Sequence, residues 1–250
     1  MKTFIAVQAI ALVAVAGAYA DPVTFVDNLP GAFLDISSTG TAITAVGDDS
    51  EHLIDTTVGN AAFPATNQVC IGNNGVLMAG VTAVCSVGFT NAAIGAGSAV
   101  PAGITPTTAL GYLLPFWDDL DPAPEPSNTT LYWQEIGDTL YVQWNNDGHF
   151  SWAVGDGTVT FQVQVFSSGP ILAQFLYPDP AFGGSDAAFD NGLSATIGYV
   201  DGANAFADAN AQWSFNTASI MSGTVLSLVP EPASFGLLAI GGLALLRRRR

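Results

Sequence analysis

The chain of 250 residues carries 21 acidic and only five basic side chains, which gives a formal net charge of −16 at pH 7. The basic residues are confined to the two ends of the chain, as Lys2 and as Arg247, Arg248, Arg249 and Arg250. A nucleic-acid partner is excluded, because binding to phosphates needs Lys and Arg. Salt bridges to Lys or Arg are excluded within residues 3–246 for the same reason.

The first 20 residues have the three parts of a secretory signal peptide. Lys2 lies in a short basic start, residues 4–17 form an apolar run, and Ala18-Tyr19-Ala20 is a small-residue cleavage sequence. The apolar run is short for a membrane-spanning helix, which needs roughly 20 apolar residues. We therefore expect export by the Sec translocon and cleavage by signal peptidase after Ala20.

Residues 21–228 are predicted to form one all-β domain, a single antiparallel β-sandwich with jelly-roll-like topology. Short runs of alternating apolar and polar residues are divided by Gly, Asn, Asp and Pro. Residues 131–136 and 139–144 are joined by Gly137-Asp138 and predict a tight hairpin. Further strands are expected at residues 33–36, 42–46, 76–81, 112–117, 158–166, 171–177 and 193–200.

The run at residues 158–166 alternates most regularly. Its valines and Phe161 are expected on one face, with Thr160, Gln162 and Gln164 on the other, because successive side chains of a strand point to opposite faces. No segment has the period of a long amphipathic helix.

Cys70 and Cys85 are the only cysteines. An even count in an exported chain predicts a disulfide between them. Two free buried thiols are the alternative, and zinc is a poor fit because no His or further Cys lies close to them in the sequence.

Three aspartates, Asp118, Asp119 and Asp121, follow an aromatic run and are candidate calcium ligands, since carboxylate oxygens on a loop suit this cation. A solvated acidic turn is the alternative, because the spacing lacks the glycine and the bidentate glutamate of an EF-hand. A second, weaker candidate group is Asp48, Asp49 and Glu51.

No catalytic motif stands out, and we expect a non-enzymatic protein. His52 and His149 lie near neither a nucleophile elbow nor a zinc-binding helix motif. A glycosidase would need two carboxylates, for which Glu51, Glu125 and Glu135 are formal candidates together with the aspartates.

Tryptophans are candidates for a sugar-stacking platform, although most aromatic side chains on alternating strands are core residues. The five tryptophans are Trp117, Trp133, Trp144, Trp152 and Trp213.

A series of short segments resembles the β-sandwich modules of secreted bacterial proteins and of the animal nidogen-type extracellular domain. The segments share an Asn-Gly turn, a Phe-Trp-Asp-Asp-Leu-Asp run, a Trp strand and two later strands. They lie at residues 71–77, 113–121, 131–133, 140–144, 160–163 and 195–198. The resemblance spans residues 31–201 and implies a non-catalytic adhesion or matrix module.

The last part of the chain has Pro230-Glu231-Pro232, an apolar segment at residues 235–246 and four terminal arginines. This order resembles the PEP-CTERM sorting signal of Gram-negative bacteria, and we assign residues 229–250 to it. An apolar helix of this length, about 18 Å at ~1.5 Å per residue, is short for a permanent anchor. Arg247, Arg248, Arg249 and Arg250 should stay in the cytoplasm by the positive-inside rule.

The resemblance implies that an exosortase, a membrane cysteine transpeptidase, recognises Pro230, Glu231 and Pro232 and processes the tail. We therefore expect an exported protein that is held transiently at the inner membrane and then reaches the cell surface or the extracellular matrix. A structural or adhesive role with exopolysaccharide in biofilm is the expected function, with no cofactor. The alternatives are a calcium-dependent carbohydrate-binding module and a secreted polysaccharide hydrolase.

Overall fold

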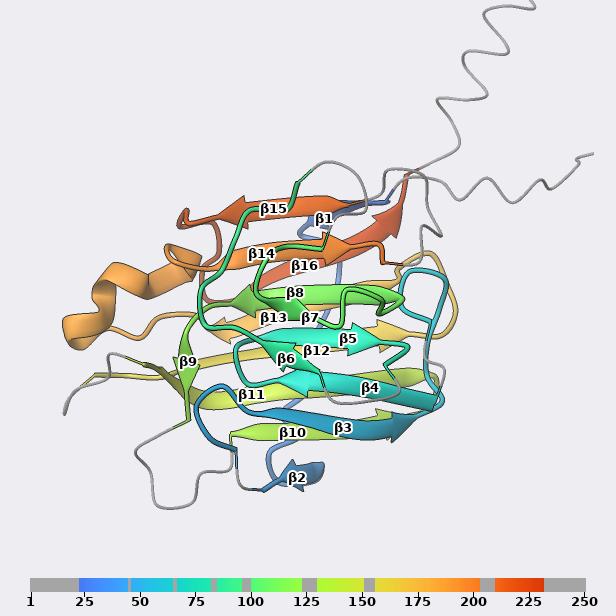
Figure 1. Cartoon of the computed structure of the whole chain (residues 1–250), viewed down its shortest axis with the longest axis horizontal. Coiled ribbons are helices and arrows are strands. Elements are labelled where there is room, and N and C mark those ends of the chain that lie inside the picture. The colour runs from blue at the N-terminus through green and yellow to red at the C-terminus, as the bar shows by residue number, and fades with distance from the viewer. Residues whose placement is uncertain are drawn as a thin grey trace, which may run out of the picture.

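The computed structural model describes residues 23–44, 46–64, 67–81, 85–95, 100–122, 130–150, 156–202 and 210–231. Two antiparallel sheets lie face to face (Figure 1). Sheet A contains, in spatial order, β1 (Val23–Asp27), β16 (Thr224–Pro230), β13 (Ala173–Asp179), β12 (Val159–Phe166), β11 (Thr139–His149), β10 (Leu131–Ile136) and β2 (Thr41–Ile43). Strand β9 (Leu120–Asp121) pairs with the end of β11.

Sheet B contains β15 (Ala211–Phe215), β14 (Thr196–Val200), β8 (Gly111–Trp117), β5 (Val76–Ala79), β4 (Asn67–Gly72) and β3 (Glu51–Thr56). The short strands β6 (Ser86–Val87) and β7 (Ile104–Thr105) pair with each other. One short 3-10 helix, η1 (Gly184–Gly192), is present in the described residues.

The main core lies between the two sheets and follows the alternation of the strands. On β12, Phe161 and Val163 are fully buried within this core. Phe161 stacks on Phe116 of sheet B, with ring centroids 5.4 Å apart, and on Trp144 of β11 at 4.8 Å. The predicted all-β sandwich is therefore confirmed.

Most predicted strands are present within a few residues of their expected bounds. The predicted hairpin is β10 and β11, with Ile136 opposite Thr139 at the turn. Consecutive strands β10 to β13 are neighbours in sheet A, and β3 to β5 are neighbours in sheet B. Crossovers join the two sheets, since β13 lies beside β16 and β8 lies beside β14.

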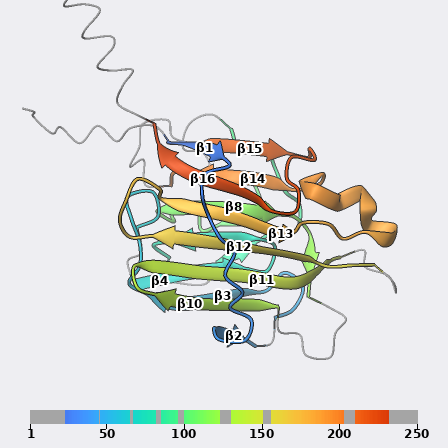
Figure 2. The same cartoon turned by 180° about the vertical axis from the view of Figure 1, so that it is seen from behind.

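The strand predicted at residues 33–36 is wrong. Residues 30–36, here called the strap, cross the outer face of sheet A between β1 at one edge and β2 at the other (Figure 2). Glutamine side chains hold the backbone of the strap where a neighbouring strand would otherwise do so. Gln164 Nε2 donates to Ala32 O at 2.9 Å, and Ile36 N donates to Gln143 Oε1 at 2.9 Å.

The outer face of sheet B has a different cover. The segment around β6 and β7, here called the flap (residues 85–95 and 100–110), lies over this face (Figure 1). Val87 and Ile104 of the flap are buried against Met78 and Leu114 of the sheet, in a second apolar cluster.

The sandwich has two distinct ends. We call the end where β1 begins and β16 finishes the terminal end, because Val23 pairs there with Pro230. The opposite, or distal, end is where β8 and β11 finish and where β9 pairs with β11. The described residues contain no helix that is long and apolar enough to cross a membrane.

Candidate functional site

Three carboxylates meet at the distal end of the sandwich. Asp48 and Asp49 come from the loop before β3, and Asp119 comes from the link between β8 and β9. One oxygen atom from each lies within 4.8 Å of the others. The two groups that the sequence offered as separate candidates therefore meet in one place, although each contributes only some of its members.

The turn between β4 and β5 brings these two loops together. Asn74 donates from Nδ2 to Asp49 Oδ1 at 2.7 Å and accepts at Oδ1 from the backbone N–H of Leu120 at 2.9 Å. Its neighbour Asn73 donates to Leu120 O at 2.7 Å. Gly75 closes the turn at φ +72°, where a Cβ atom would lie 1.9 Å from Phe116 O. Both asparagines are fully buried, so this turn is a fixed support for the acidic loops.

Two exposed aromatic rings complete the site. Phe89 and Phe150 are 56 % and 57 % exposed. They line a cavity of about 190 Å³ together with Asp48, Asp49 and Asp119. Neither phenylalanine was a candidate in the sequence, because isolated phenylalanines outside regular strands carry no pattern.

Burial and neighbouring negative charges raise the pKa of two carboxyl groups at the distal end. Burial and the neighbouring charges of Asp48 and Asp49 raise the pKa of Asp119 to about 6. Burial, Asp49 and Asp121 also raise the pKa of Asp48. A cation would relieve this repulsion, and carboxylate oxygens at these separations suit a hard cation such as Ca²⁺.

Asp147 on β11 is a more extreme case. It is fully buried, and neither of its carboxylate oxygens has a hydrogen-bond partner. Burial, followed by the charge of Asp121, raises its pKa well above the ordinary value. Protonation of Asp147 removes the large desolvation penalty of a buried unpaired charge.

The expected calcium group Asp118, Asp119 and Asp121 does not come together. Asp118 is buried and turned toward other partners: Ser194 donates to its Oδ2, and His149 Nε2 lies 3.8 Å from its Oδ1. Asp121 lies on β9, opposite Gly148 of β11. Of the three aspartates, only Asp119 belongs to the group of carboxylates that could hold a metal ion.

The imidazole ring of His149 is packed between aromatic side chains. Its ring stacks on Phe189 with centroids 3.7 Å apart and meets Phe182 edge-on at 5.5 Å. Burial lowers its pKa, although Asp118 and Asp186 act in the opposite direction. Ser194 is bonded to Asp118 and not to the imidazole, so these residues do not have the order of a Ser–His–Asp triad.

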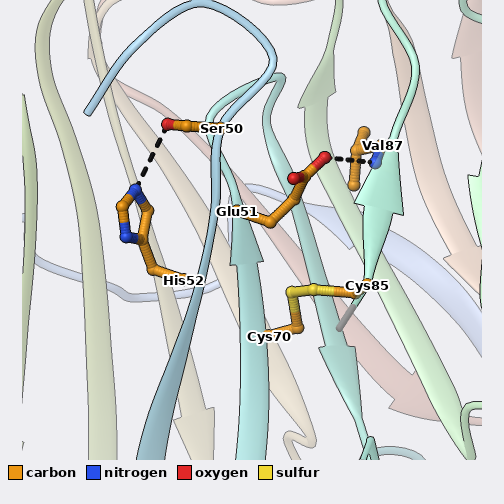
Figure 3. Close-up of a disulfide and its surroundings, with 6 residues drawn as sticks. All are labelled: Ser50, Glu51, His52, Cys70, Cys85 and Val87. Carbon is orange, nitrogen blue, oxygen red and sulfur yellow. Dashed lines mark hydrogen bonds between the residues drawn. A yellow bond between two sulfur atoms is a disulfide. The ribbon is translucent and has the colours of Figure 1, made fainter. Parts of the chain in front are cut away.

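The remaining candidate acids and the second histidine lie elsewhere. Glu51 accepts a hydrogen bond from the backbone N–H of Val87 at 2.7 Å, and His52 Nε2 lies 3.2 Å from Ser50 Oγ (Figure 3). Glu51 thus ties β3 to the flap and does not join Asp48 and Asp49. Burial raises the pKa of Glu51 and lowers that of His52.

Glu135 links the two sheets at one edge. Its Oε1 accepts from Thr56 Oγ1 of β3 and from the backbone N–H of Thr57 at 3.0 Å. It also lines a cavity of about 280 Å³ with Asp55, Thr56 and Thr57. The third candidate acid, Glu125, lies outside the described residues.

The tryptophans whose burial is complete are core residues. Trp117 donates from Nε1 to Gly88 O at 2.9 Å, and Trp144 donates to Asn73 O at 3.1 Å. Trp133 and Trp213 are partly buried against the main core, and Trp152 lies outside the described residues. Among the described residues, the exposed aromatic side chains that line the distal cavity are Phe89 and Phe150.

Cys70 of β4 and Cys85 of the flap form the predicted disulfide (Figure 3). Both residues are buried in the second apolar cluster. The bond fastens the flap to sheet B.

The sorting residues begin inside the fold. Pro230 is the last residue of β16, and Glu231 follows it. Strand β16 therefore runs two residues past the domain boundary that we predicted at residue 228. The predicted cleavage residues Ala18 and Ala20, Pro232, the apolar segment and the terminal arginines lie outside the described residues.

Comparison with known proteins gives one match. Residues 228–250 match the family model of the PEP-CTERM protein-sorting motif. No curated protein and no solved structure matches the chain, so the nidogen-like resemblance of the body stays a prediction. The motif implies export and processing by an exosortase. The chain is thus a protein with a PEP-CTERM exosortase signal at its C-terminal side and a β-sandwich before it.

Proposed function

We propose that this protein is a non-enzymatic component of the cell envelope or extracellular matrix, with a structural or adhesive role beside exopolysaccharide. The single observation that carries the proposal is the sorting motif at residues 228–250 directly after a β-sandwich. Support also comes from the interior, where aliphatic and aromatic side chains fill the space between the sheets.

Processing takes place in two steps in this proposal. The Sec translocon and signal peptidase export the chain and cut after Ala20. Exosortase then uses its cysteine sulfur to displace the amine of the departing tail from a carbonyl carbon near Pro230. The amine takes up a proton, and the thioester passes the body to an acceptor amine or to water.

The chain offers a matched control for this step. Its sequence contains Pro-Glu-Pro twice, at Pro124-Glu125-Pro126 and at Pro230-Glu231-Pro232. Replacing the second copy with alanines should block tail removal, whereas replacing the first should leave it unchanged. Intact mass of the exported protein gives the result, and normal tail removal without the second copy contradicts the proposal.

A second candidate function is calcium-dependent binding of a carbohydrate at the distal end. The observation that favours it is the cavity where Asp48, Asp49 and Asp119 lie beside exposed Phe89 and Phe150. Calcium coordinates carboxylate oxygens and sugar hydroxyls alike, and aromatic rings cover the apolar faces of sugars.

A glycan array with calcium or with EDTA tests this candidate on the exported protein. Phe150→Ala should lower glycan binding and keep the calcium-induced rise of Tm, whereas Asp119→Asn should lower both. Exposed Leu193 supplies the matched control, as Leu193→Ala should change neither. Absence of calcium-dependent binding to every glycan rejects this second function.

A further inference from the structure

The sorting motif has no linker between it and the fold. In strand β16, Val229 lies opposite Thr24, and Pro230 lies opposite Val23. The motif of Pro230, Glu231 and Pro232 thus starts in a residue that is paired with β1. Only residues 231–234 separate β16 from the apolar segment, and four extended residues span at most about 14 Å.

Strand β16 is an internal strand of sheet A, so its two edges are occupied. On one side Leu228 lies opposite Ala173 of β13, and Leu172 N donates to Leu228 O at 2.9 Å. On the other side β1 pairs along five residues, and Asn28 N donates to Val225 O at 3.2 Å. Beyond Leu228, the pairing with β13 ends and only β1 holds the last two residues.

An enzyme that binds an extended chain in a cleft uses the same backbone groups that a neighbouring strand uses. The backbone groups of Val229 cannot bond Thr24 of β1 and an enzyme cleft at the same time, whereas Pro230 has no N–H and lies beside Val23 without being held by such a bond. The pairing of Thr24 with Val229 is therefore in competition with recognition of the chain at the start of the motif.

We propose that exosortase engages its motif only after Val229 and Pro230 separate from β1, so that opening of the β1–β16 end sets the rate of tail removal. This inference rests on the proposed processing by exosortase. Separation of strand ends is the least costly opening of a fold. Only the β1 partners are lost there, while Leu226 and Leu228 stay in the core.

The same geometry orients the protein during processing. The terminal end faces the membrane, because four residues cannot hold it further away than about 14 Å. The acidic residues Asp48, Asp49 and Asp119 lie at the opposite end, away from the membrane.

A disulfide across the terminal pair tests the proposal in the full chain, in a host that contains an exosortase. Thr24→Cys with Val229→Cys locks the last pair before the motif and leaves Pro230, Glu231 and Pro232 intact. The matched control is Val26→Cys with Ser227→Cys, two residues further into the same strand pair on the same face. Alkylation and intact mass verify each new disulfide, and the two thermal midpoints verify folding.

Pulse-chase measurement of tail removal should show the Thr24–Val229 lock slowed by about tenfold or more, because the lock abolishes the open end. The Val26–Ser227 lock should follow the wild-type rate. A second variant, with Gly-Ser-Gly-Ser inserted between Val229 and Pro230, should be processed faster than wild type without any new disulfide. Wild-type rates in both the terminal lock and the insertion overturn the inference. Absence of tail removal in wild type would overturn the proposed sorting itself.

Discussion

The two outer faces of the sandwich are covered in opposite ways. Sheet B is covered by the flap mainly through apolar contacts, with Val87, Ile104 and the disulfide in the buried cluster and a few hydrogen bonds, such as that from Trp117 to Gly88 O, beside them. Sheet A is covered by the strap, and the contact is mainly polar. Gln162 and Gln143 of the sheet are fully buried beneath it.

The two covers differ in their effect: the flap mainly adds stability, and the strap mainly fixes the position of a segment. Apolar burial is non-directional, so the flap adds stability in proportion to the area that leaves water. Amide hydrogen bonds are directional, so the strap is held at one register. Gln162 shows this: its Nε2 donates to Leu34 O at 2.6 Å, and its Oε1 accepts from Gln164 Nε2 at 2.8 Å. The glutamines therefore specify position more than they add stability.

Trp117→Ala should have the largest effect, because it removes the largest side chain under the flap. Trp117 is fully buried and bonded to Gly88 O. The expected loss is about 3–5 kcal/mol of the free energy of unfolding, measured by denaturant titration. The control Trp213→Ala on β15 is only partly buried and should lose less. Equal losses would contradict the importance assigned to the apolar cover.

Removal of the disulfide comes next. Cys70→Ala with Cys85→Ala should lower the free energy of unfolding by about 2–5 kcal/mol. The flap should open before the rest of the sandwich, since the disulfide joins it directly to β4. Hydrogen exchange should therefore accelerate at Gly88 and Ile104 while the amides of β12 stay protected. Uniform acceleration through both sheets would show that the flap is not a separate unit.

Gln162→Leu should have a smaller effect on stability and a larger one on position. It removes the partner of Leu34 O and leaves Gln164 Nε2 with only its bond to Ala32 O, for an expected loss of about 1–3 kcal/mol. Hydrogen exchange at Leu34 and Ile36 should accelerate while the flap amides stay unchanged. Gln68→Leu on β4 is a control, because Gln68 bonds only the exposed Asp55. Unchanged exchange in the strap contradicts a positional role for the glutamines.

These glutamines also mark where the fold could be predicted. The alternation in residues 158–166 correctly placed Gln162 and Gln164 opposite the valines. It could not show that this polar face is covered, because a solvated face and a face bonded to a distant backbone have the same sequence pattern. The strap was read as a strand for a related reason: its backbone is held much as in a sheet, but by side chains.

The candidate site was predictable in composition and not in geometry. Aspartates on two loops suggested a cation, but the pairing of Asp119 with Asp48 and Asp49 depends on a turn about 45 residues before Asp119. In the sequence, Asn73, Asn74 and Gly75 indicate only a tight turn. The phenylalanines of the cavity had no pattern at all. By contrast, the sorting motif is a contiguous sequence signal and was read correctly without a structure.

The smallest expected effect is the pH dependence of stability that comes from Asp119. The carboxylates around it at the distal end are partly buried and have no Lys or Arg partner. Because burial and nearby carboxylates raise the pKa of Asp119 to about 6, the folded protein holds this proton more tightly than the unfolded chain, whose Asp pKa is near 3.9. The protonated Asp119 side chain therefore adds to the free energy of unfolding below about pH 4, and this contribution is lost as the pH rises to about 6.

Asp119→Asn should abolish this pH-dependent loss of stability, since an amide cannot ionise. Thermal midpoints in EDTA between pH 4 and 7 should fall less steeply in the variant than in wild type. Asp27→Asn supplies the control, as this exposed residue of β1 is not a member of the group of Asp48, Asp49 and Asp119. At pH 7, calcium should raise the thermal midpoint of wild type above that of Asp119→Asn, because it stabilises wild type alone. The bound cation takes the place of the proton that Asp119 loses at neutral pH. Parallel pH profiles in EDTA would show that the repulsion among these carboxylates is screened by solvent, as in an ordinary exposed acidic surface.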